Sequence, residues 1–285
     1  MNVLVTGGSG FIGSHVVDKL MQAGHQVRVL DQKKPCQKDV EFIKGDVTSE
    51  LDIAKSLRNI DVVYHIAAFS NIDLVRDHPL STIEVNIMGT ARILEKCRGS
   101  GVQRFIYASS VFVSDTRGHL YTTSKLASEM ICKNYNTLYG LPCTILRYGT
   151  AYGPRSRRAD VVSIFAERAL QHKKLTIRGN GEQKRHFIYV EDLARGNLAA
   201  LGVTHACRTY ILADTQPITI NELAAIVQEE TGNDVGIRHQ NARNDDYLGD
   251  VSGVETSKRE LDWKPEVGIR EGIRKYLGWY IETSR

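Results

Sequence analysis

The chain has 285 residues, of which 42% are hydrophobic and 25% are charged, so it has the composition of a globular protein that can bury a large core. Its formal net charge of +4 is small for this length, and no long run of Lys and Arg is present, which argues against a nucleic-acid-binding protein. The charge is compatible with an anionic small-molecule substrate.

The sequence shows no targeting, membrane or metal-binding signal. It begins directly with the strand-like residues 2–7, so we expect no signal or transit peptide, and no apolar run approaches the roughly 20 residues that span a bilayer. The five cysteines lack any metal-ligand spacing, and the nine histidines form no paired motif. We therefore predict no metal site, reduced thiols and a cytoplasmic protein.

The first half of the sequence alternates short apolar runs with amphipathic stretches. The apolar runs are rich in β-branched residues and nearly continuous, which is typical of strands buried on both faces of a parallel sheet. They cover residues 2–7, 26–31, 41–47, 61–68, 104–110 and 142–149. The amphipathic stretches, several of which end in glycine as helices commonly do, cover residues 14–24, 51–59, 82–101 and 122–140. This alternation predicts right-handed βαβ units and an α/β, Rossmann-type doubly wound parallel sheet.

The pattern becomes less regular after about residue 150. Helical periodicity is found at residues 161–174, 219–233 and 268–282, and short strand-like runs at 175–179, 208–213 and 235–239. We expect residues 1–150 to form the main α/β domain and residues 151–285 a smaller lobe. Some of its segments, such as 185–213, are expected to return to the sheet.

A glycine-rich turn joins the first predicted strand to the first predicted helix. In the stretch "VTGGSGFIG" the glycines stand at Gly7, Gly8, Gly10 and Gly13. Glycines allow a tight turn, a close approach of the backbone to a pyrophosphate at the helix N-terminus, and close packing of the helix on its strand. A glycine pattern alone also occurs in ordinary tight turns, but the strand before it and the helix after it indicate dinucleotide binding.

Acidic residues follow the second and third predicted strands. Asp31 can accept hydrogen bonds from both ribose hydroxyls of a dinucleotide and would repel a 2′-phosphate, which favours NAD over NADP. Lys33 and Lys34 follow closely and leave NADP open. Asp46 and Val47 are candidates to hold the edge of the adenine ring. The alternative is that they only end the strand and bind no ligand.

Several ordered motifs give the chain a resemblance to a known family. They are "TGGSGFIG" at 6–13, "YTTSK" at 121–125, "RYGTAYGPR" at 147–155, "GNGEQKRHFIYVEDLA" at 179–194 and "SKRELDWKP" at 257–265. Together they resemble an extended short-chain dehydrogenase/reductase of the nucleotide-sugar epimerase/dehydratase branch. The resemblance implies a Rossmann domain that binds NAD and a C-terminal substrate-binding lobe. The cofactor-binding residues it implies are Gly7, Gly10, Phe11, Ile12, Gly13, Asp31, Asp46, Val47, Ala67, Lys125 and Tyr148.

The resemblance identifies Tyr121 and Lys125 as the catalytic pair, whereas alone they would be an ordinary i, i+4 pair on a helix. Oxidation of a sugar carbinol sends the hydroxyl proton to a base while hydride leaves to NAD⁺. Free Tyr has a pKa of about 10, and lowering it by about three units takes roughly 4 kcal/mol. A Lys cation one turn away and the positive nicotinamide supply this in a desolvated site. By the family's pattern Ser110 bonds the reacting oxygen, with Ser109 as the alternative.

The sequence departs from the family before Tyr121. The interval from Ser110 to Tyr121 is about half of that in most relatives, so the sugar pocket is expected to be more open. The acid pair of the family's dehydratases does not follow Ser110, and the glutamate of its decarboxylases is missing as well. Both absences favour 4-epimerisation, in which the sugar is oxidised and then reduced from the other face.

Substrate-binding positions are implied by the same resemblance. Thr150 stands where most relatives have Asn. At this position the chain resembles the epimerases that act on uronic-acid sugars more than those that act on neutral sugars. Arg185 matches the arginine that binds the substrate pyrophosphate. Arg243 and Asp246 fit a second arginine and its acidic partner, with an alignment that is loose by about two residues. His186 stands where the family usually has Asp, and no role is assigned to it.

The function predicted from the sequence is an NAD-dependent nucleotide-sugar 4-epimerase that acts on a UDP-hexose or a UDP-uronic acid. One alternative is an NAD(P)-dependent ketone reductase or dehydrogenase of the extended short-chain family. Another is a non-catalytic NAD-binding regulator, which is disfavoured because Tyr121 and Lys125 are both present. The resemblance also implies a homodimer that pairs through the helices at 81–98 and 122–139 in a four-helix bundle.

Overall fold

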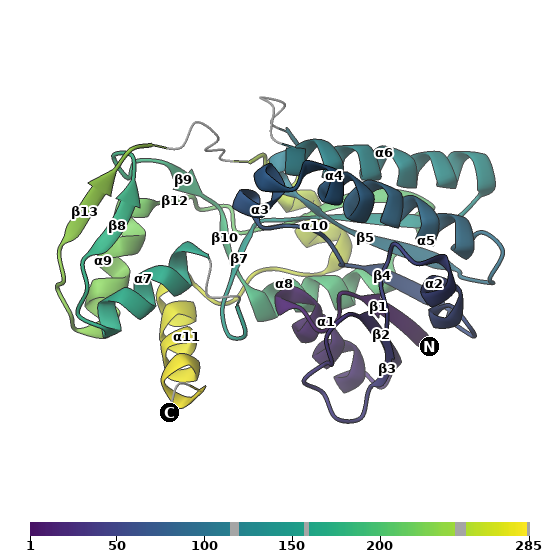
Figure 1. The fold of residues 1–285 in the computed structure, drawn as a ribbon, viewed down its shortest axis with the longest axis horizontal. Coiled ribbons are helices and arrows are strands. Elements are labelled where there is room, and N and C mark those ends of the chain that lie inside the picture. The colour runs from purple at the N-terminus through teal and green to yellow at the C-terminus, as the bar shows by residue number, and fades with distance from the viewer. Residues whose placement is uncertain (115–119, 157–159, 243–248, 284–285) are drawn as a thin grey trace.

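The fold is built on a seven-stranded parallel sheet in the computed structural model, which describes residues 1–114, 120–156, 160–242 and 249–283 (Figure 1). The strand order is β11-β6-β5-β4-β1-β2-β3. These strands are β1 (Asn2–Thr6), β2 (Gln26–Asp31), β3 (Glu41–Lys44), β4 (Val62–His65), β5 (Arg104–Ser110), β6 (Cys143–Tyr148) and β11 (Cys207–Leu212). The sheet confirms the predicted α/β, Rossmann-type doubly wound architecture.

Helices cover both faces of this sheet because its central strands are apolar on both sides. The helices of one face are α1 (Phe11–Gln22) and α8 (Val190–Ala199), and those of the other are α2 (Glu50–Ser56), α5 (Gly89–Cys97) and α6 (Leu120–Tyr139). Val17 of α1 and Leu193 of α8 share one buried cluster with the sheet, whereas Ile93 of α5 and Cys132 of α6 belong to the other. These two buried clusters hold α1 and α6, which carry predicted site residues, against opposite faces of the sheet.

The strand order reverses between β1 and β4. β1 pairs with β2 on one side and with β4 on the other, and all these pairings are parallel. In open α/β sheets, ligands bind outside the carboxyl ends of the strands at such a reversal. The residues that follow Thr6 and His65 therefore mark where a ligand is expected.

The C-terminal part adds a smaller lobe, seen at the left of Figure 1. Its strand pairs are β10–β7, β12–β9 and β13–β8. Its elements are β7 (Thr150–Tyr152), α7 (Val161–Leu170), β8 (Leu175–Arg178), β9 (Lys184–Arg185), β10 (Phe187–Tyr189), β12 (Ile218–Thr219), α9 (Ile220–Thr231), β13 (Ile237–Gln240) and α11 (Ile269–Thr283). Tyr152, Phe165 and Tyr276 belong to a buried cluster of its own. The chain returns from this lobe to the main layers through α8 and β11, and α10 (Val254–Leu261) packs on β11.

The region before α5 differs from the sequence-based prediction of one helix over residues 82–101. It holds α3 (Ile72–Asp77), α4 (Pro79–Thr82) and a π-helical segment, Ile83–Met88. A π-helical turn is rare and is frequently found at functional sites. Hydrophobic periodicity does not reveal it, because the apolar face shifts by only one residue. Short 3₁₀ helices at Val111–Ser114 and Ala200–Gly202 complete the described elements.

The described part of the chain offers neither a membrane-spanning helix nor a cluster of metal ligands. None of the helices in these ranges is long and apolar enough to cross a membrane. The same ranges contain no group of three or more His, Cys, Asp or Glu side chains that could hold a metal ion. All five cysteines are free thiols, and four of them are at least partly buried.

Candidate active site

The glycine turn forms a close-packed cradle between β1 and α1. Gly7 has a φ of +73°, and a Cβ built on it would lie 2.6 Å from the backbone nitrogen of Ala67. A Cβ on Gly13 would lie 2.1 Å from the carbonyl oxygen of Gly7. No side chain caps the N-terminus of α1 at Gly10, so the backbone N–H groups of the turn that begins at Phe11 are left for a ligand. This arrangement fits a pyrophosphate, which binds where such amide groups converge.

Two acidic side chains stand beside this cradle. Asp31 ends β2, and its carboxylate accepts hydrogen bonds from the backbone N–H groups of Ser9 and Lys33, each at 3.0 Å. Asp46 accepts from both the backbone and the hydroxyl of Thr48 at 2.8 Å. Burial alone would raise the pKa of Asp46, but the hydrogen bonds from Thr48 and Gln32 together outweigh it and hold that pKa below its ordinary value. Both groups are fixed acceptors next to the switch point of the sheet.

Other predicted cofactor residues form the walls around the cradle. Ala67 follows β4 and limits the space at Gly7. Val47 is buried and lies against the start of α5, where a Cβ on Gly89 would come within 3.1 Å of its side chain. Ile12 is half-buried and packs on the cluster between α1 and α8. The structure therefore brings these predicted residues to one edge of the sheet.

Tyr148 has a different surrounding from the other predicted cofactor residues. It ends β6, and its buried hydroxyl donates a hydrogen bond to Oδ1 of Asn197 at 2.6 Å. The backbone oxygen of Asn197 accepts a second bond from the hydroxyl of Tyr64 at 2.9 Å. The Tyr148 side chain is thus bonded inside the core between the sheet and α8, so the structure does not bring its hydroxyl to the cradle.

Tyr121 and Lys125 lie one turn apart on α6, beside the end of β5. Nζ of Lys125 is 6.0 Å from the centre of the Tyr121 ring and 4.9 Å from that of the Tyr107 ring. It donates a hydrogen bond to the carbonyl oxygen of Ala108 at 2.8 Å. Lys125 is only 3% exposed, and burial lowers its pKa to about 8. The ammonium has three donors, so it can bond the strand and still serve Tyr121 and a ligand.

The two serines that end β5 have different partners. The hydroxyl of Ser109 donates to Oε1 of Glu129 at 2.5 Å, beneath α6. Ser110 accepts a bond from the backbone N–H of Phe112 at 3.3 Å, and its own proton has no acceptor within the described ranges. Ser109 is therefore bound within the core, whereas Ser110 keeps a free donor. This difference favours Ser110 over Ser109 as the residue that meets a substrate.

The predicted substrate residues lie where the lobe meets the sheet. Thr150 donates its N–H to the carbonyl oxygen of His186 at 2.8 Å, and its buried Oγ1 has no hydrogen-bond partner within the described residues. His186 is 5% exposed, its Nδ1 lies 3.0 Å from the carbonyl oxygen of Asp214, and burial lowers its pKa. A neutral His therefore occupies the position of the family's Asp. Arg185 on β9 is half-buried and donates to the carbonyl oxygen of Lys184 at 2.7 Å.

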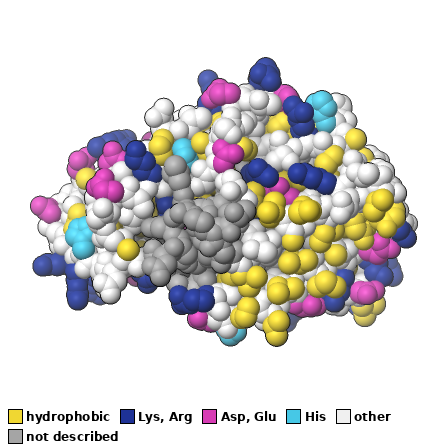
Figure 2. Space-filling view, turned by 90° about the horizontal axis from the view of Figure 1, so that it is seen from above, with side chains coloured by type: hydrophobic (Ala, Val, Ile, Leu, Met, Phe, Trp, Pro, Cys, Tyr) yellow, Lys and Arg dark blue, Asp and Glu magenta, His cyan; other side chains and the backbone are white. Residues whose placement is uncertain are grey.

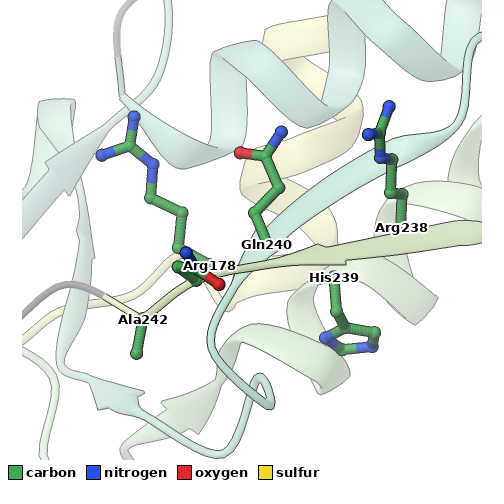
Figure 3. A pocket seen from close by; sticks show the side chains of 6 residues that line it. Arg178, Arg238, His239, Gln240 and Ala242 are labelled. Carbon is green, nitrogen blue, oxygen red and sulfur yellow. The ribbon is translucent and has the colours of Figure 1, made fainter.

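A cavity of about 480 Å³ lies on the ribbon of β8 and β13 in the C-terminal lobe (Figure 3). It is lined by Arg178, Arg238, His239, Gln240, Asn241 and Ala242. Arg178 and Gln240 are register partners, and with Arg238 they point to the same side of the ribbon. Arg243 and Asp246, predicted from the sequence, follow this segment directly but lie outside the described residues. The cavity contains no residue of α6 or β5, so it is separate from the Tyr121–Lys125 pair and adds two cationic side chains.

Asn86 is a structural part of the site that the sequence analysis missed. It lies in the π-helical segment, is 1% exposed, and its Oδ1 accepts from the N–H of Phe69 at 2.7 Å. Its Nδ2 donates to the carbonyl oxygen of Phe69 and to the hydroxyl of Ser124 on α6. Asn86 thereby joins the segment after β4 to the helix that carries Tyr121. A buried amide in an otherwise apolar helical pattern was the available signal.

Comparisons with known proteins agree with this geometry. The sequence profile of the "NAD dependent epimerase/dehydratase family" matches residues 3–212. A Methanocaldococcus jannaschii protein, provisionally named a UDP-glucose 4-epimerase, is 32% identical over 309 residues, with 99% of each chain covered. UDP-glucuronic acid decarboxylase 1 of Xenopus tropicalis is 30% identical over 302 residues, which cover 98% of this chain and 72% of that protein. The crystal structure of a UDP-glucose 4-epimerase from Thermotoga maritima with UDP-glucose has a TM-score of 0.93 at 30% identity, with both chains fully covered. The chain therefore belongs to the NAD dependent epimerase/dehydratase family.

Proposed function

We propose that the protein is an NAD-dependent nucleotide-sugar 4-epimerase that acts on a UDP-hexose or a UDP-uronic acid. The reaction oxidises C4 of the sugar to a ketone and reduces it again from the opposite face. The observation that carries this proposal is the buried Lys125 ammonium one turn from Tyr121, at the edge of the sheet where the glycine cradle lies. Family membership and the likeness to an epimerase crystallised with UDP-glucose support it.

The chain supplies binding and proton transfer for this reaction. When bound, NAD accepts hydride from C4 and returns it. The glycine cradle and Asp31 would hold its pyrophosphate and adenosine ribose, because both offer fixed groups of the required polarity. Tyr121 would take the proton of the C4 hydroxyl and give it back after reduction. Lys125 would stabilise the tyrosinate, and Ser110 would bond the reacting oxygen.

The surroundings of Ser110 favour epimerisation over loss of water or carbon dioxide. Ser110 is followed by Val111, which is buried, and by Phe112, so neither neighbour offers a carboxylate. The buried carboxylate of Glu129 accepts two hydrogen bonds from Arg147 and is therefore not placed to act on a sugar. A 4-keto sugar in such a pocket would be reduced rather than decarboxylated. Carbon dioxide release remains a distinct outcome of the test below.

The C-terminal lobe, residues 151–285, would bind the nucleotide diphosphate. Arg185 and the two arginines of the β8–β13 cavity would supply positive charge to it, and Arg243 with Asp246 would extend this contact. The unpartnered Oγ1 of Thr150 would bond the sugar. This polar group is smaller than the Asn it replaces, which leaves room for a carboxylate at C5 of a uronic acid.

Replacement of Ser110 and replacement of Ser109 by alanine are expected to affect kcat to different extents. Ser110→Ala should lower kcat for epimerisation by about 10²-fold, because it removes the hydrogen bond to the reacting oxygen. Ser109→Ala should lower kcat by less than about tenfold, because Ser109 touches no reacting atom, and should lower the free energy of unfolding by about 1 kcal/mol, because one hydrogen bond to Glu129 is lost. Steady-state kinetics at saturating sugar nucleotide and urea unfolding measure the two effects. An equal loss of kcat in both variants would contradict the assignment of Ser110.

The assembly proposed is a homodimer that pairs through the α5 and α6 region, in the cytoplasm. Figure 2, which views the molecule from the α6 side, shows hydrophobic side chains gathered over one half of this face. Exposed apolar side chains on α4, the π-helical segment and α6 include Leu80, Met88, Met130 and Leu138. Leu94 is buried against the sheet instead and cannot contribute. Sedimentation at twice the chain mass of 31.9 kDa would support the dimer, and sedimentation at that mass alone would exclude it.

The test of the function is NMR spectroscopy of the purified protein with UDP-glucose, UDP-N-acetylglucosamine or UDP-glucuronic acid and no added cofactor. A C4 epimer from any of them would establish an epimerase that retains NAD, and the preferred sugar would test the role of Thr150. Formation of a UDP-pentose from UDP-glucuronic acid would show a decarboxylase instead. Turnover only after addition of NAD(P)H and a ketone would show a reductase.

A further inference from the structure

An ion pair between a fully buried carboxylate and a partly exposed guanidinium lies beneath the catalytic face of α6. The carboxylate of Glu129 is fully buried, and Arg147 of β6 donates to both of its oxygens, through Nε at 2.9 Å and Nη2 at 2.7 Å. The hydroxyl of Ser109 on β5 donates to Oε1 at 2.5 Å. Ser109 and Arg147 are register partners in the parallel pair β5–β6, so the sheet itself presents both donors to the carboxylate. Glu129 therefore has a single defined position.

This carboxylate is aligned with the proposed catalytic pair. Tyr121, Lys125 and Glu129 follow one another at intervals of four residues and so share one face of α6. Lys125 bonds the carbonyl oxygen of Ala108, and Glu129 bonds the hydroxyl of the next residue, Ser109. Two consecutive residues of β5 thus hold the cation and the anion of α6. The end of β5 that carries Ser110 is fixed by both.

Stability alone does not account for this arrangement. An ion pair that buries a carboxylate is often no more stabilising than apolar side chains of the same volume, because the buried charge must be desolvated. The Arg208–Glu260 pair shows that the same two-bond geometry can form nearer the surface. There both side chains keep some contact with water, so the loss of hydration costs less. A fully buried carboxylate one turn from Lys125 instead has a direct electrostatic consequence, because it favours the charged form of the lysine.

We propose that Glu129 is a positioning residue of the reaction: fixed by Arg147 and Ser109, it keeps the Lys125 ammonium charged and holds the end of β5 so that Ser110 meets the substrate. The part that concerns the substrate rests on the proposed function. The effect on the charge of Lys125 is a property of the fold and holds for any reaction that uses this pair.

Glu129 is the anion that acts on Lys125 among the described groups around it. The titratable side chains that face Lys125 are Tyr121, Glu129 and Cys132 on α6, Tyr107 on β5 and His65 on β4. Burial raises the pKa of Cys132 and that of Tyr107 well above their ordinary values, and it lowers the pKa of His65 to about 3. These three groups are therefore neutral at pH 7. A Cys132 thiolate would also oppose the effect of burial on the pKa of Lys125, but burial keeps this thiol protonated, which leaves Glu129 in that role.

Glu129→Gln is the variant that tests this role. It removes the anion and leaves the Arg147 cation without this partner, so that Asp250 is the remaining carboxylate that acts on Arg147 among the described groups. The pKa of Lys125 should then fall by about one unit. Because the ammonium is the active form, activity is lost as pH rises through this pKa. The alkaline limb of the kcat/KM profile should therefore move to lower pH by about one unit.

Three further variants separate charge from packing. Glu129→Asp keeps the charge and should keep the alkaline limb within about 0.3 pH units of the wild type. The double variant Glu129→Gln, Arg147→Gln removes both charges. Its alkaline limb should therefore lie between the limb of Glu129→Gln and that of the wild type. Glu260→Gln breaks the surface pair with Arg208 and should leave the limb unchanged. A limb that does not move in Glu129→Gln, with only a lower rate or a lower stability, would overturn the proposal.

A second readout does not depend on catalysis. In protein labelled with ¹³C at Cε of lysine, the Lys125 resonance can be identified by its loss in Lys125→Met and followed as pH is raised. The midpoint should lie about one unit lower in Glu129→Gln than in the wild type. If the wild type epimerises nothing, the proposed function fails while this titration still decides the role of Glu129. Equal midpoints in both proteins would overturn it.

Discussion

Replacement of Tyr121 by Phe is expected to lower kcat for epimerisation by about 10³-fold, with the fold and the bound NAD retained. The substitution removes the hydroxyl that takes the C4 proton and keeps the ring that packs 6.0 Å from Nζ of Lys125. Among the described neighbours of Tyr121, neither Lys125 nor Ser110 can replace it, because the Lys125 ammonium has no free lone pair while it is charged and Ser110 is a weak base. Steady-state kinetics and thermal unfolding of the purified variant measure the two parts of this prediction.

Tyr139→Phe is the matched control for this variant. Tyr139 lies at the end of the same helix, is 47% exposed, and its ring packs under Arg98 rather than near Lys125. The loss of its hydroxyl should change kcat by less than about twofold, as is usual for surface substitutions. If Tyr121→Phe kept more than about a tenth of the wild-type kcat, another residue would have to be the base, and the assignment of Tyr121 would be wrong.

Gly13→Ala is expected to weaken NAD binding by about 100-fold or more. The new Cβ would lie 2.1 Å from the carbonyl oxygen of Gly7, which is backbone and cannot rotate away. Relief of the clash has to push α1 away from the end of β1, at a cost of about 3 kcal/mol, and this opens the cradle that fits the pyrophosphate. Alanine otherwise stabilises a helix relative to glycine, so a loss here has the opposite sign to the ordinary effect.

The matched control for Gly13 is Gly278, a helical glycine of α11. A Cβ there would meet nothing within 4 Å, so Gly278→Ala should raise the free energy of unfolding by up to about 1 kcal/mol and leave NAD binding unchanged. The NAD content of each purified variant, measured after denaturation, gives the comparison. Wild-type NAD content in Gly13→Ala would show that the cofactor does not lie on this turn.

Much of the fold could be predicted because its signals are local. Continuous apolar runs such as Val62–His65 predict strands buried on both faces, and the glycine turn marks the first β-to-α connection. The strand at Cys207–Leu212 was expected to return to the sheet, and it pairs with β6. The π-helical segment, Ile83–Met88, was missed because its periodicity differs too little from that of an α-helix.

The candidate site was predictable in its residue types but not in its partners. The sequence left Ser109 and Ser110 as alternatives, and the choice depends on Glu129, which is nineteen to twenty residues away and reaches only Ser109. The bond from Tyr148 to Asn197 likewise joins residues that the chain separates widely. Such pairings depend on strand register and helix rotation, which are set by packing of the whole sheet and not by local sequence.

The residues proposed to bind the sugar nucleotide were the hardest to predict from the sequence. Thr150 and Arg185 were placed by resemblance, and the proposed substrate site adds to them the cavity arginines Arg178 and Arg238 and uses the unpartnered Oγ1 of Thr150. The cavity arginines carry no motif, because their proximity arises from pairing of β8 with β13 across a long stretch of chain. Arg243 and Asp246 remain predictions from the resemblance.

The measurement that tests the central claim most directly is epimerisation in D₂O, followed by NMR at C4 of the sugar. If Tyr121 removes the hydroxyl proton while the C4 hydrogen moves as hydride and returns, the product should carry ordinary hydrogen at C4 and no deuterium at any carbon. Deuterium at C4 would show that the hydrogen left as a proton and exchanged with solvent. Such a result would contradict transient oxidation of C4 by hydride transfer with Tyr121 as the base, whatever the yield of epimer.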